Sequence, residues 1–311
     1  MPPFVACISP MQPRWPTLLL LLLGSCLAKP KDAATVDDVN TRKGVEKERR
    51  MFSRADAYER FMGRWSRLLA PALVEYSQVN DGGSVLDVGS GTGALAFAVR
   101  DATTTALVLG VDLSPEYVSY ATSRNFDTRV HFEVGDAQAL RQHDASFERA
   151  ISLLVLNFVP DPRRALAEMI RVTRPGGIVS AAVWDYGQGM EMLRVFWDEA
   201  AALDHAIAQH DEKKMPLCNQ GELAALFRAA KLEAVSETPL VVQMQFSSFD
   251  DYWQPFHLGQ GPAGAYVATL SLERRAALGE RLRARLLGHG PDRPLEMKAR
   301  AWAAKGTVPL R

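Results

Sequence analysis

A glycine-rich turn after an apolar run is the first place in this chain where the backbone could hold a ligand. Residues 85–93 read Val-Leu-Asp-Val-Gly-Ser-Gly-Thr-Gly, so that Gly89, Gly91 and Gly93 alternate with other residues. Glycine lets the backbone turn sharply and approach a ligand closely, and the free N–H groups at the start of the next helix then face that ligand. Because three alternating glycines cost more conformational entropy than a bare turn requires, the pattern predicts a binding loop.

Two kinds of nucleotide cofactor fit such a loop. Gly89, Gly91 and Ala94 satisfy the G-x-G-x-x-G/A fingerprint of a dinucleotide site. Asp87 favours the other kind, because a carboxylate two residues before the first glycine would repel a pyrophosphate but can hold the cationic amino end of a methionine moiety. We therefore expect a sulfonium cofactor, S-adenosylmethionine, and keep a nicotinamide dinucleotide as the alternative.

Acidic residues also follow the next two expected strands. In the segment Gly-Val-Asp-Leu at 110–113, the Asp112 side chain can accept hydrogen bonds from both ribose hydroxyls of an adenosine, with Leu113 beside it. Asp136 could accept from an adenine amino group while the Ala137 N–H donates to the ring, or it could cap a following helix. Carboxylates at successive strand ends favour a ligand, because open α/β sheets bind ligands outside the carboxyl ends of their strands.

A parallel sheet would bring these strand ends together. Short β-branched runs alternate with helical stretches, which predicts βαβ units and a sheet buried on both faces. Strands are expected near 84–88, 106–111, 129–134, 148–154, 177–184, 235–246 and 299–307. Helices should fill the gaps between them, and one of these starts well because Ser114 can cap it and Pro115 suits its first turn. Arg-Pro-Gly-Gly at 174–177 should stop the helix over 162–173 and turn the chain.

Further helices are expected on either side of this core. Apolar residues recur at three- and four-residue spacing from Ser53 onward, which indicates an amphipathic helix. Beyond Trp184 we expect helices near 193–205 and 222–230 and a long helix spaced by leucines after residue 270. The segment 257–262, with two glycines and a proline, predicts an ordinary lead-in loop to that helix, with a lid over a pocket as the alternative.

These motifs resemble those of the class I methyltransferase superfamily, and in particular its small-molecule branch, similar to quinone-biosynthesis methyltransferases. The resemblance covers roughly Tyr58 to Trp184, and Arg-Val-Thr-Arg-Pro-Gly-Gly at 171–177 matches the usual lead into the fifth strand. It departs mildly at 147–148, where Phe-Glu replaces Phe-Asp, and no family motif follows residue 190. The resemblance implies an α/β fold with a doubly wound, mostly parallel, Rossmann-like sheet of seven strands, an antiparallel final strand, and a C-terminal helical cap.

By motif position, the resemblance also implies which residues contact the cofactor. Asp87, Gly89 and Gly91 would lie near its methionine part, and Asp112 would bind the ribose. The adenine would lie against Asp136 and Ala137, and the methyl group against Leu154 and Asn157.

No fixed set of catalytic residues is expected, because methyl transfer from a sulfonium mainly requires that the two reactants be aligned and desolvated. If the accepting atom must lose a proton, the candidate bases are His257, Asp185 and Tyr186, although each has an ordinary structural role open to it. Residues 156–159 (Leu-Asn-Phe-Val) lack the Asn/Asp-Pro-Pro-aromatic segment of enzymes that methylate DNA amino groups, and no paired glutamates that could hold a guanidinium follow strand four. Aromatic residues that precede and follow the sheet in the sequence suit a flat, apolar small-molecule acceptor, or simply pack the core.

Composition narrows the partners. Lysine plus arginine equals aspartate plus glutamate at 36 each, so no global field favours nucleic acid or anionic lipid. Of the three cysteines only Cys218 lies after residue 50, so neither a disulfide framework nor a cysteine-rich zinc site is expected there, and we expect no metal. The composition leaves the oligomeric state open.

The first fifty residues contain a leader-like pattern. A leucine run at 18–23 follows Arg14 and precedes Gly-Ser-Cys-Leu-Ala, which resembles a secretory leader too short to span a membrane. Because the expected cofactor is made in the cytosol, we expect a cytoplasmic protein, with export or anchoring by residues 1–28 as the alternative and a later start at Met51 as a further one.

We therefore expect residues 1–50 to be a leader or a disordered segment and 51–311 to be a methyltransferase domain. Its cofactor-binding core would span 80–185, and its cap and final strands 186–311. An NAD-dependent oxidoreductase and a non-catalytic S-adenosylmethionine-binding protein are the alternative functions.

Overall fold

A computed structural model describes residues 54–204, 207 and 211–310; the leader expected at 1–50 lies outside the described residues. The strands are β1 (Ser84–Val88), β2 (Leu107–Asp112), β3 (Val130–Val134), β4 (Phe147–Leu153), β5 (Thr173–Trp184), β6 (Glu233–Phe246) and β7 (Leu295–Thr307). The helices are α2 (Ala55–Tyr58), η1 (Glu59–Gly63), α3 (Arg64–Tyr76), α4 (Ala94–Ala102), α5 (Pro115–Ser123), α6 (Pro162–Val172), α7 (Glu191–Leu203), η3 (Glu212–Lys214), α8 (Glu222–Ala229), α9 (Phe249–Trp253), η4 (Gln254–Leu258), α10 (Gly261–Thr269) and α11 (Leu272–Leu287).

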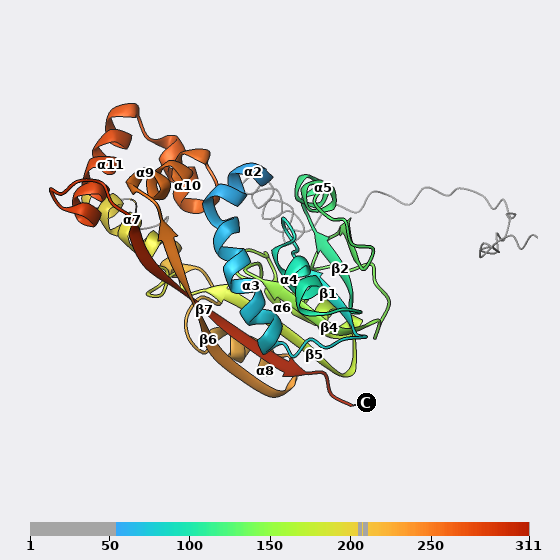
Figure 1. Ribbon diagram of the computed structural model, residues 1–311. Helices are drawn as coiled ribbons and strands as arrows, with labels where there is room; N and C mark the ends of the chain where they lie inside the picture. The colour runs from blue at the N-terminus through green and yellow to red at the C-terminus, as the bar shows by residue number, and fades with distance from the viewer. Residues whose placement is uncertain (1–53, 205–206, 208–210, 311) are drawn as a thin grey trace, which may run out of the picture.

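The strands form one seven-stranded sheet in the order β3-β2-β1-β4-β5-β7-β6 (Figure 1). Strands β1 to β5 pair in parallel, and β7 lies antiparallel between β5 and β6. From β1 the strand order runs to β2 and β3 on one side and to β4 and β5 on the other. The carboxyl ends of β1 and β4 therefore flank a topological switch point, which is where such sheets bind ligands. The predicted doubly wound, mostly parallel seven-stranded sheet is confirmed.

Helices cover both faces of the sheet, because successive strand residues point to opposite sides. Val85 of β1 packs into one core with Leu73 of α3 and Leu95 of α4. Leu86, the next residue, packs into the other core with Leu166 of α6. The helix predicted to start at Ser114 is confirmed: the Ser114 side chain accepts the N–H of Tyr117 at 3.3 Å.

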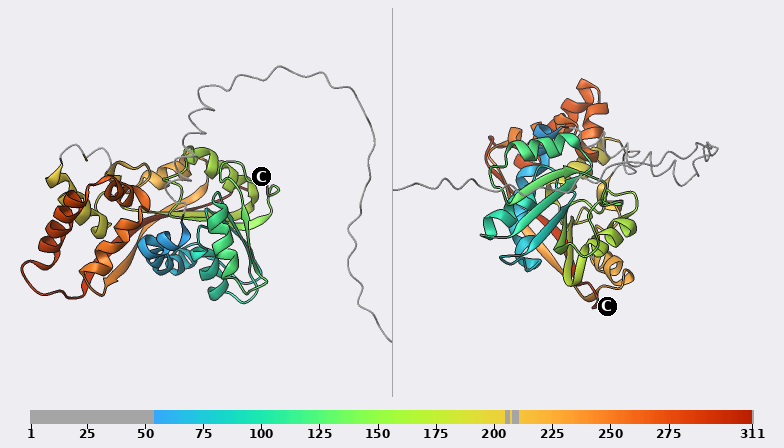
Figure 2. Two further views of the ribbon diagram at one scale, coloured as in Figure 1. Left: turned by 90° about the horizontal axis from the view of Figure 1, so that it is seen from above. Right: turned by 90° about the vertical axis from the view of Figure 1, so that its right-hand side faces the viewer.

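The C-terminal half of the chain builds a helical cap around one long hairpin. Strands β6 and β7, of 14 and 13 residues, run out beyond the rest of the sheet, and α7, α9, α10 and α11 gather at that end (Figures 1 and 2). Phe256 joins the cap to the N-terminal helices, because its ring stacks on Phe196 of α7 at 4.6 Å and meets the edge of Phe61 in η1 at 5.2 Å. The cap is therefore packed directly against the chain segment that precedes the sheet.

One predicted helix is wrong. Among the described residues between β3 and β4 the chain forms turns, so Asp136 caps no helix. The backbone there is held instead by α6: Arg171 donates to the carbonyls of Leu140 and Gln142 at 2.9 and 2.8 Å, and Glu168 accepts the Leu140 N–H at 2.8 Å. Side chains distant in sequence thus satisfy backbone groups that a helix would otherwise pair.

Two loop predictions are also corrected. Residues 174–177 lie within β5, where the pairing with β4 is irregular between the pairs Phe147–Thr173 and Arg149–Ile178. Helix α6 ends at Val172, one residue before its predicted end. The expected loop at 257–262 is shorter, because η4 includes residues up to Leu258 and α10 begins at Gly261.

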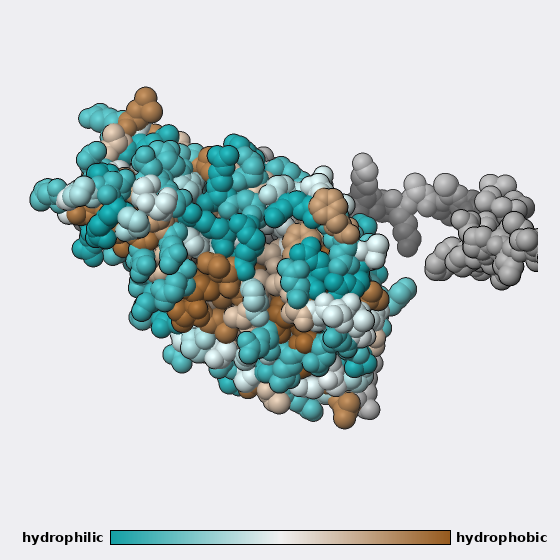
Figure 3. All heavy atoms as spheres, in the orientation of Figure 1, coloured by the Kyte–Doolittle hydropathy of each residue, from teal (hydrophilic) through white to brown (hydrophobic). Residues whose placement is uncertain are grey.

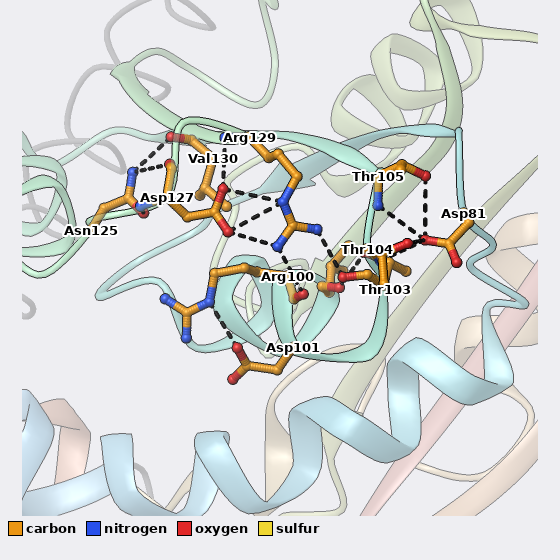
Figure 4. A network of polar contacts seen from close by, with 11 residues as sticks. Asp81, Arg100, Asp101, Thr103, Thr104, Thr105, Asn125, Asp127, Arg129 and Val130 are labelled. Atoms are coloured by element: carbon orange, nitrogen blue, oxygen red, sulfur yellow. Dashed lines mark hydrogen bonds and ion pairs between the residues drawn. The ribbon is translucent and has the colours of Figure 1, made fainter.

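Polar residues at the amino ends of the strands have a structural role. Arg129, just before β3, donates to Asp127 at 2.6 Å and to the carbonyl of Thr103 at 2.8 Å (Figure 4). Asp81, just before β1, accepts the N–H groups of Thr104 and Thr105 at 2.6 and 3.0 Å. Because all of these residues precede their strands, the network ties together the loops at the amino edge of the sheet, away from the strand tips.

The surface drawn in Figure 3 is mostly hydrophilic, with apolar side chains gathered beside α3. The exposed apolar residues of α3 and the neighbouring β6 include Leu68 and Val241. Across the described ranges of the chain, no helix has both the length and the apolar character that a bilayer crossing requires.

Candidate functional site

A cavity opens at the carboxyl tips of β1, β2 and β4, under the cap. It contains about 950 Å³ of empty space, part of which is open to solvent. Its polar side is formed by Asp87, the glycine turn and Asp112. Its apolar side is formed by residues of the N-terminal helices, the strand tips and the cap: Phe61, Met62, Leu154, Phe158, Trp184, Tyr186, Leu193 and Pro262.

A second hollow, with about 350 Å³ of empty space that includes open solvent, lies at the carboxyl tips of β2 and β3. It is lined by Leu113, Asp136 and Ala137, and it shares Gly89 and Asp112 with the larger cavity. The two spaces therefore share a wall at the glycine turn. Asp136 is held in this hollow by the N–H of Gln138, which it accepts at 2.8 Å.

Asp87 is fully buried at the end of β1, with only half of its carboxyl group satisfied. One oxygen accepts the N–H of Ala96 in α4 at 3.1 Å, while the other, Oδ1, has no partner. Burial raises the pKa of Asp87 to about 8; the Ala96 N–H lowers it and the neighbouring Asp112 raises it. A cationic ligand group would both satisfy the second oxygen and favour the ionised form.

Asp112 ties the glycine turn to the tip of β2. Its Oδ2 accepts the N–H of Gly91 and its Oδ1 accepts the N–H of Ser114, both at 2.8 Å. Burial raises the pKa of Asp112, and these two N–H groups lower it. Because a carboxylate oxygen can accept more than one hydrogen bond, both oxygens retain the capacity to accept from ligand hydroxyls.

The glycines at 89 and 91 are needed for different reasons. Gly89 has φ +76°, and a Cβ built on it would lie 2.5 Å from Cγ2 of Val155, so a side chain does not fit. Gly91 has φ +53°, and a Cβ there would meet nothing within 4 Å, although the residue lines the cavity. Gly91 thus leaves open a space that a larger residue would begin to fill.

The segment after β4 brings one of its two expected residues to the cavity. Leu154 lines it in a left-handed conformation with φ 65°, and its N–H is bonded to the Ala182 carbonyl at 2.8 Å. Non-glycine residues in this region of φ and ψ concentrate at functional sites. Asn157 lines neither space; its amide nitrogen lies 3.9 Å from the sulfur of Met215, and its buried Oδ1 has no partner.

The three candidate bases lie in different surroundings. His257 is outside the lining of the cavity, with Nδ1 3.3 Å from Gln254 Oε1. Asp185 forms an ion pair with Arg300 at 2.5 Å, also outside the lining. Burial acts to raise the pKa of Asp185, but the Gln188 N–H and the Arg300 guanidinium hold it below its usual value. Tyr186 does line the cavity, buried, with its ring 6.5 Å from that of Phe158.

The polar residues of the lining that were not predicted from the sequence include Ser90, Tyr117 and Glu212. Ser90 and Tyr117 each bring a buried hydroxyl that has no hydrogen-bond partner. Glu212 brings a buried carboxyl group from the cap. Ser90 was within the glycine motif and could have been considered, whereas Glu212 lies in the run Asp-Glu-Lys-Lys at 211–214, which has the composition of a solvated turn.

The unpartnered atoms fit a polar ligand that carries an adenosine and an amino acid. Buried polar atoms are normally hydrogen-bonded, so Asp87 Oδ1, Ser90 Oγ and Tyr117 Oη on one wall indicate groups awaiting partners. They lie around the turn whose N–H groups and open Gly91 position can approach such a ligand.

Comparison with known proteins agrees with this geometry. Residues 86–181 match the family model described as methyltransferase domain. An uncharacterised protein of Mycobacterium tuberculosis is 35% identical over 140 residues, covering 43% of this chain and 50% of the relative. The ubiquinone/menaquinone biosynthesis C-methyltransferase of Bdellovibrio bacteriovorus is 38% identical over 120 residues, covering 37% of this chain and 49% of that enzyme. The chain thus spans about half the length of these relatives.

A solved structure extends the likeness in fold. Haemonchus contortus phosphoethanolamine N-methyltransferase 2, in complex with phosphomonomethylethanolamine and S-adenosylhomocysteine, superposes with a TM-score of 0.54 at 17% identity, covering 87% of this chain and 60% of that one. The fold is thus Rossmann-like, and residues 86–181 are similar to a methyltransferase domain. More particularly, this part of the chain is similar to class I S-adenosylmethionine-dependent methyltransferases of the small-molecule type.

Proposed function

We propose that this protein transfers a methyl group from S-adenosylmethionine to a small, apolar acceptor. One observation carries the proposal: a single cavity combines unsatisfied buried polar atoms around the glycine turn with many apolar lining residues. The polar atoms suit the cofactor, and the apolar residues suit a flat acceptor. The domain that does this would span residues 51–311, with its core at 80–185 and its cap at 186–311.

The cofactor would lie along the strand tips. Asp87 would hold the amino group of its methionine part, with Gly89 and Gly91 approaching that part closely. Asp112 would accept the ribose hydroxyls, beside Leu113. Asp136 and Ala137, in the smaller hollow, would contact the adenine.

The methyl end would then face the apolar wall. Leu154 lines the cavity here, and we propose that it borders the methyl group. When bound, S-adenosylmethionine supplies an already activated methyl group. The chain's own part is to align the acceptor and to exclude water. Phe158, Trp184 and Tyr186 would pack against the acceptor and keep water out of the space where the two reactants meet.

The name of the Bdellovibrio relative supports a ring-shaped acceptor for this chain, since ubiquinone and menaquinone precursors are flat. Since the cofactor is made in the cytosol, we also propose a cytoplasmic location. No nucleic acid is proposed as a partner, because the formal net charge of the chain is zero.

Methyl transfer can be tested without knowing the acceptor. The protein would be incubated with methyl-labelled S-adenosylmethionine and fractions of a cell lysate, and labelled products identified by mass. Formation of a labelled small molecule together with S-adenosylhomocysteine supports the proposal. Heat released on cofactor binding without any S-adenosylhomocysteine, in any fraction, would instead indicate a non-catalytic binding protein.

A further inference from the structure

Glu212 is a buried carboxyl group that the cap places in the cavity of the glycine turn. It lies in η3, in a segment that follows α7, and the residue is 3% exposed. It lines the same cavity as Asp87 and Tyr186, on the side built by the cap. A carboxyl group is rarely buried this deeply without a partner or a function, because removing its charge from water is costly.

Helix α7 holds Glu212 in this position through two contacts. The indole N–H of Trp197 donates to Glu212 Oε2. One turn earlier, Arg194 forms an ion pair with the neighbouring Asp211, with Nη1 3.1 Å from Oδ2. The Arg194 charge is therefore engaged by Asp211. Among the described residues, the hydrogen-bond donors to the Glu212 carboxyl group are neutral: the Trp197 indole N–H and the backbone N–H of Glu212 itself.

Among the described residues, the charged and titratable groups around Glu212 include Arg194, Asp211, Tyr186 and Cys218. The adjacent Lys213 is engaged by Asp211, with Nζ 3.2 Å from Oδ2. Burial raises the pKa of Glu212 to about 7, while the Trp197 N–H and Arg194 lower it and Asp211 raises it. A carboxyl group with a pKa near the working pH is suited to proton transfer, since both of its forms are then accessible.

Resting on the methyltransferase function proposed above, we propose that Glu212 accepts the proton of a hydroxyl group on the acceptor, and that the acceptor is a flat, apolar molecule carrying such a hydroxyl. As the bond between the acceptor oxygen and the methyl carbon forms, the bond between that carbon and sulfur breaks. The sulfur keeps the electron pair as a neutral thioether, and the hydroxyl proton passes to Glu212. A neutral hydroxyl enters an apolar cavity more easily than an ammonium group, which would have to lose its hydration.

If Glu212 had only a structural role, its contact with Trp197 would simply hold the cap in place. A spectroscopic titration tests whether the carboxyl group itself changes charge near neutral pH. The indole N–H of Trp197 reports on the charge of the carboxyl that it contacts. In ¹H–¹⁵N spectra of wild-type protein, that resonance, assigned with Trp197→Phe, should titrate near pH 7. It should lose this titration in Glu212→Gln, whose amide oxygen still accepts the indole N–H, and keep it in the matched control Glu222→Gln. A flat wild-type titration over pH 5–9 would contradict a group poised for proton transfer.

Turnover tests the catalytic part with defined probes. Wild-type protein with labelled S-adenosylmethionine should methylate 2-naphthol and not naphthalene. At saturating S-adenosylmethionine, kcat/KM for 2-naphthol should rise with pH through about 7, because Glu212 must be ionised to accept the proton. Glu212→Gln should lose about 100-fold or more in kcat and lose this rise, as expected for a general base. The affinities of Glu212→Gln and Glu222→Gln for S-adenosylhomocysteine, measured by calorimetry, should stay within about twofold of the wild-type affinity.

The outcomes separate the two proposals. If wild-type protein binds neither S-adenosylmethionine nor S-adenosylhomocysteine, the proposed function itself fails. If it binds them but methylates no naphthol, or prefers 2-naphthylamine, the proposed acceptor class is wrong. If Glu212→Gln keeps wild-type turnover and pH profile with 2-naphthol, Glu212 is not the proton acceptor.

Discussion

Binding of S-adenosylmethionine should release a proton from Asp87, and replacing Asp87 by asparagine should abolish that release. In the free protein burial holds the pKa of Asp87 at about 8, so at pH 6.5 the group is about 97% protonated. A cationic amino group placed against the unpartnered Oδ1 favours the ionised form. The account therefore predicts release of about one proton per cofactor bound at pH 6.5.

The release can be measured by titration calorimetry in two buffers of different ionisation enthalpy, whose difference in observed heat gives the number of protons transferred. Asp87→Asn should bind with about one proton fewer released, and about 10- to 100-fold more weakly, because it loses a charge-assisted hydrogen bond. Its amide is nearly isosteric, and its oxygen can still accept the Ala96 N–H. Equal proton release by the two proteins, or none by wild type, would refute the assignment of Asp87 to the amino group.

The same pKa has a consequence for stability. Because the folded pKa of Asp87 lies above the value of an unfolded chain, the folded state binds more protons between the two values. The contribution of Asp87 to the free energy of unfolding should therefore fall as pH rises from about 4 to about 8. Denaturant unfolding of cofactor-free protein should show this fall, reduced in Asp87→Asn, and a contribution that rises with pH would contradict the buried, unpaired carboxyl.

Three further substitutions test neighbouring parts of the structure. Gly91→Ala should lower the free energy of unfolding by only about 1 kcal/mol, because the new methyl group meets no protein atom. It should nevertheless weaken cofactor binding in calorimetry, because the methyl group enters the cavity; unchanged affinity would argue against a close approach of the cofactor to Gly91. Gly89→Ala should lower the free energy of unfolding by about 2 kcal/mol or more in urea, because its methyl group meets Val155, and a stability equal to that of Gly91→Ala would contradict this contact. Arg300→Met should destabilise the protein by about 1–3 kcal/mol at pH 7, because it leaves the buried Asp185 unpaired. That difference should shrink as pH falls below 4, through the lowered pKa of Asp185; a difference independent of pH would show that the ion pair does not cause it.

The sheet could be predicted closely because its signals are local. Buried parallel strands are apolar on both faces, and each of the seven predicted strands overlaps an observed one. The carboxyl ends of parallel strands meet at one edge, so Asp87 and Asp112 could be expected to lie together before any contact was known, and both line the cavity.

The features missed depend on residues distant in sequence. Nothing near residue 140 shows that Arg171, on α6, will bond the carbonyls that a helix would have paired. Glu212 lies among charged residues typical of a solvated turn, and only its contact with Trp197 and the fold of the cap reveal that it is buried. Asn157 was expected beside the methyl group from its position after β4, but the chain bends after Leu154 and leaves it behind the lining.

The central claim is that acidic side chains at neighbouring strand tips hold one adenosyl sulfonium cofactor. Calorimetric titration of wild-type protein and Asp112→Ala with S-adenosylmethionine and with NAD tests it most directly. The account predicts that wild type binds S-adenosylmethionine and not NAD, and that Asp112→Ala weakens this binding at least tenfold, because it removes the acceptor of both ribose hydroxyls and of the Gly91 N–H. Undiminished affinity in Asp112→Ala, or tight binding of NAD alone, would contradict it.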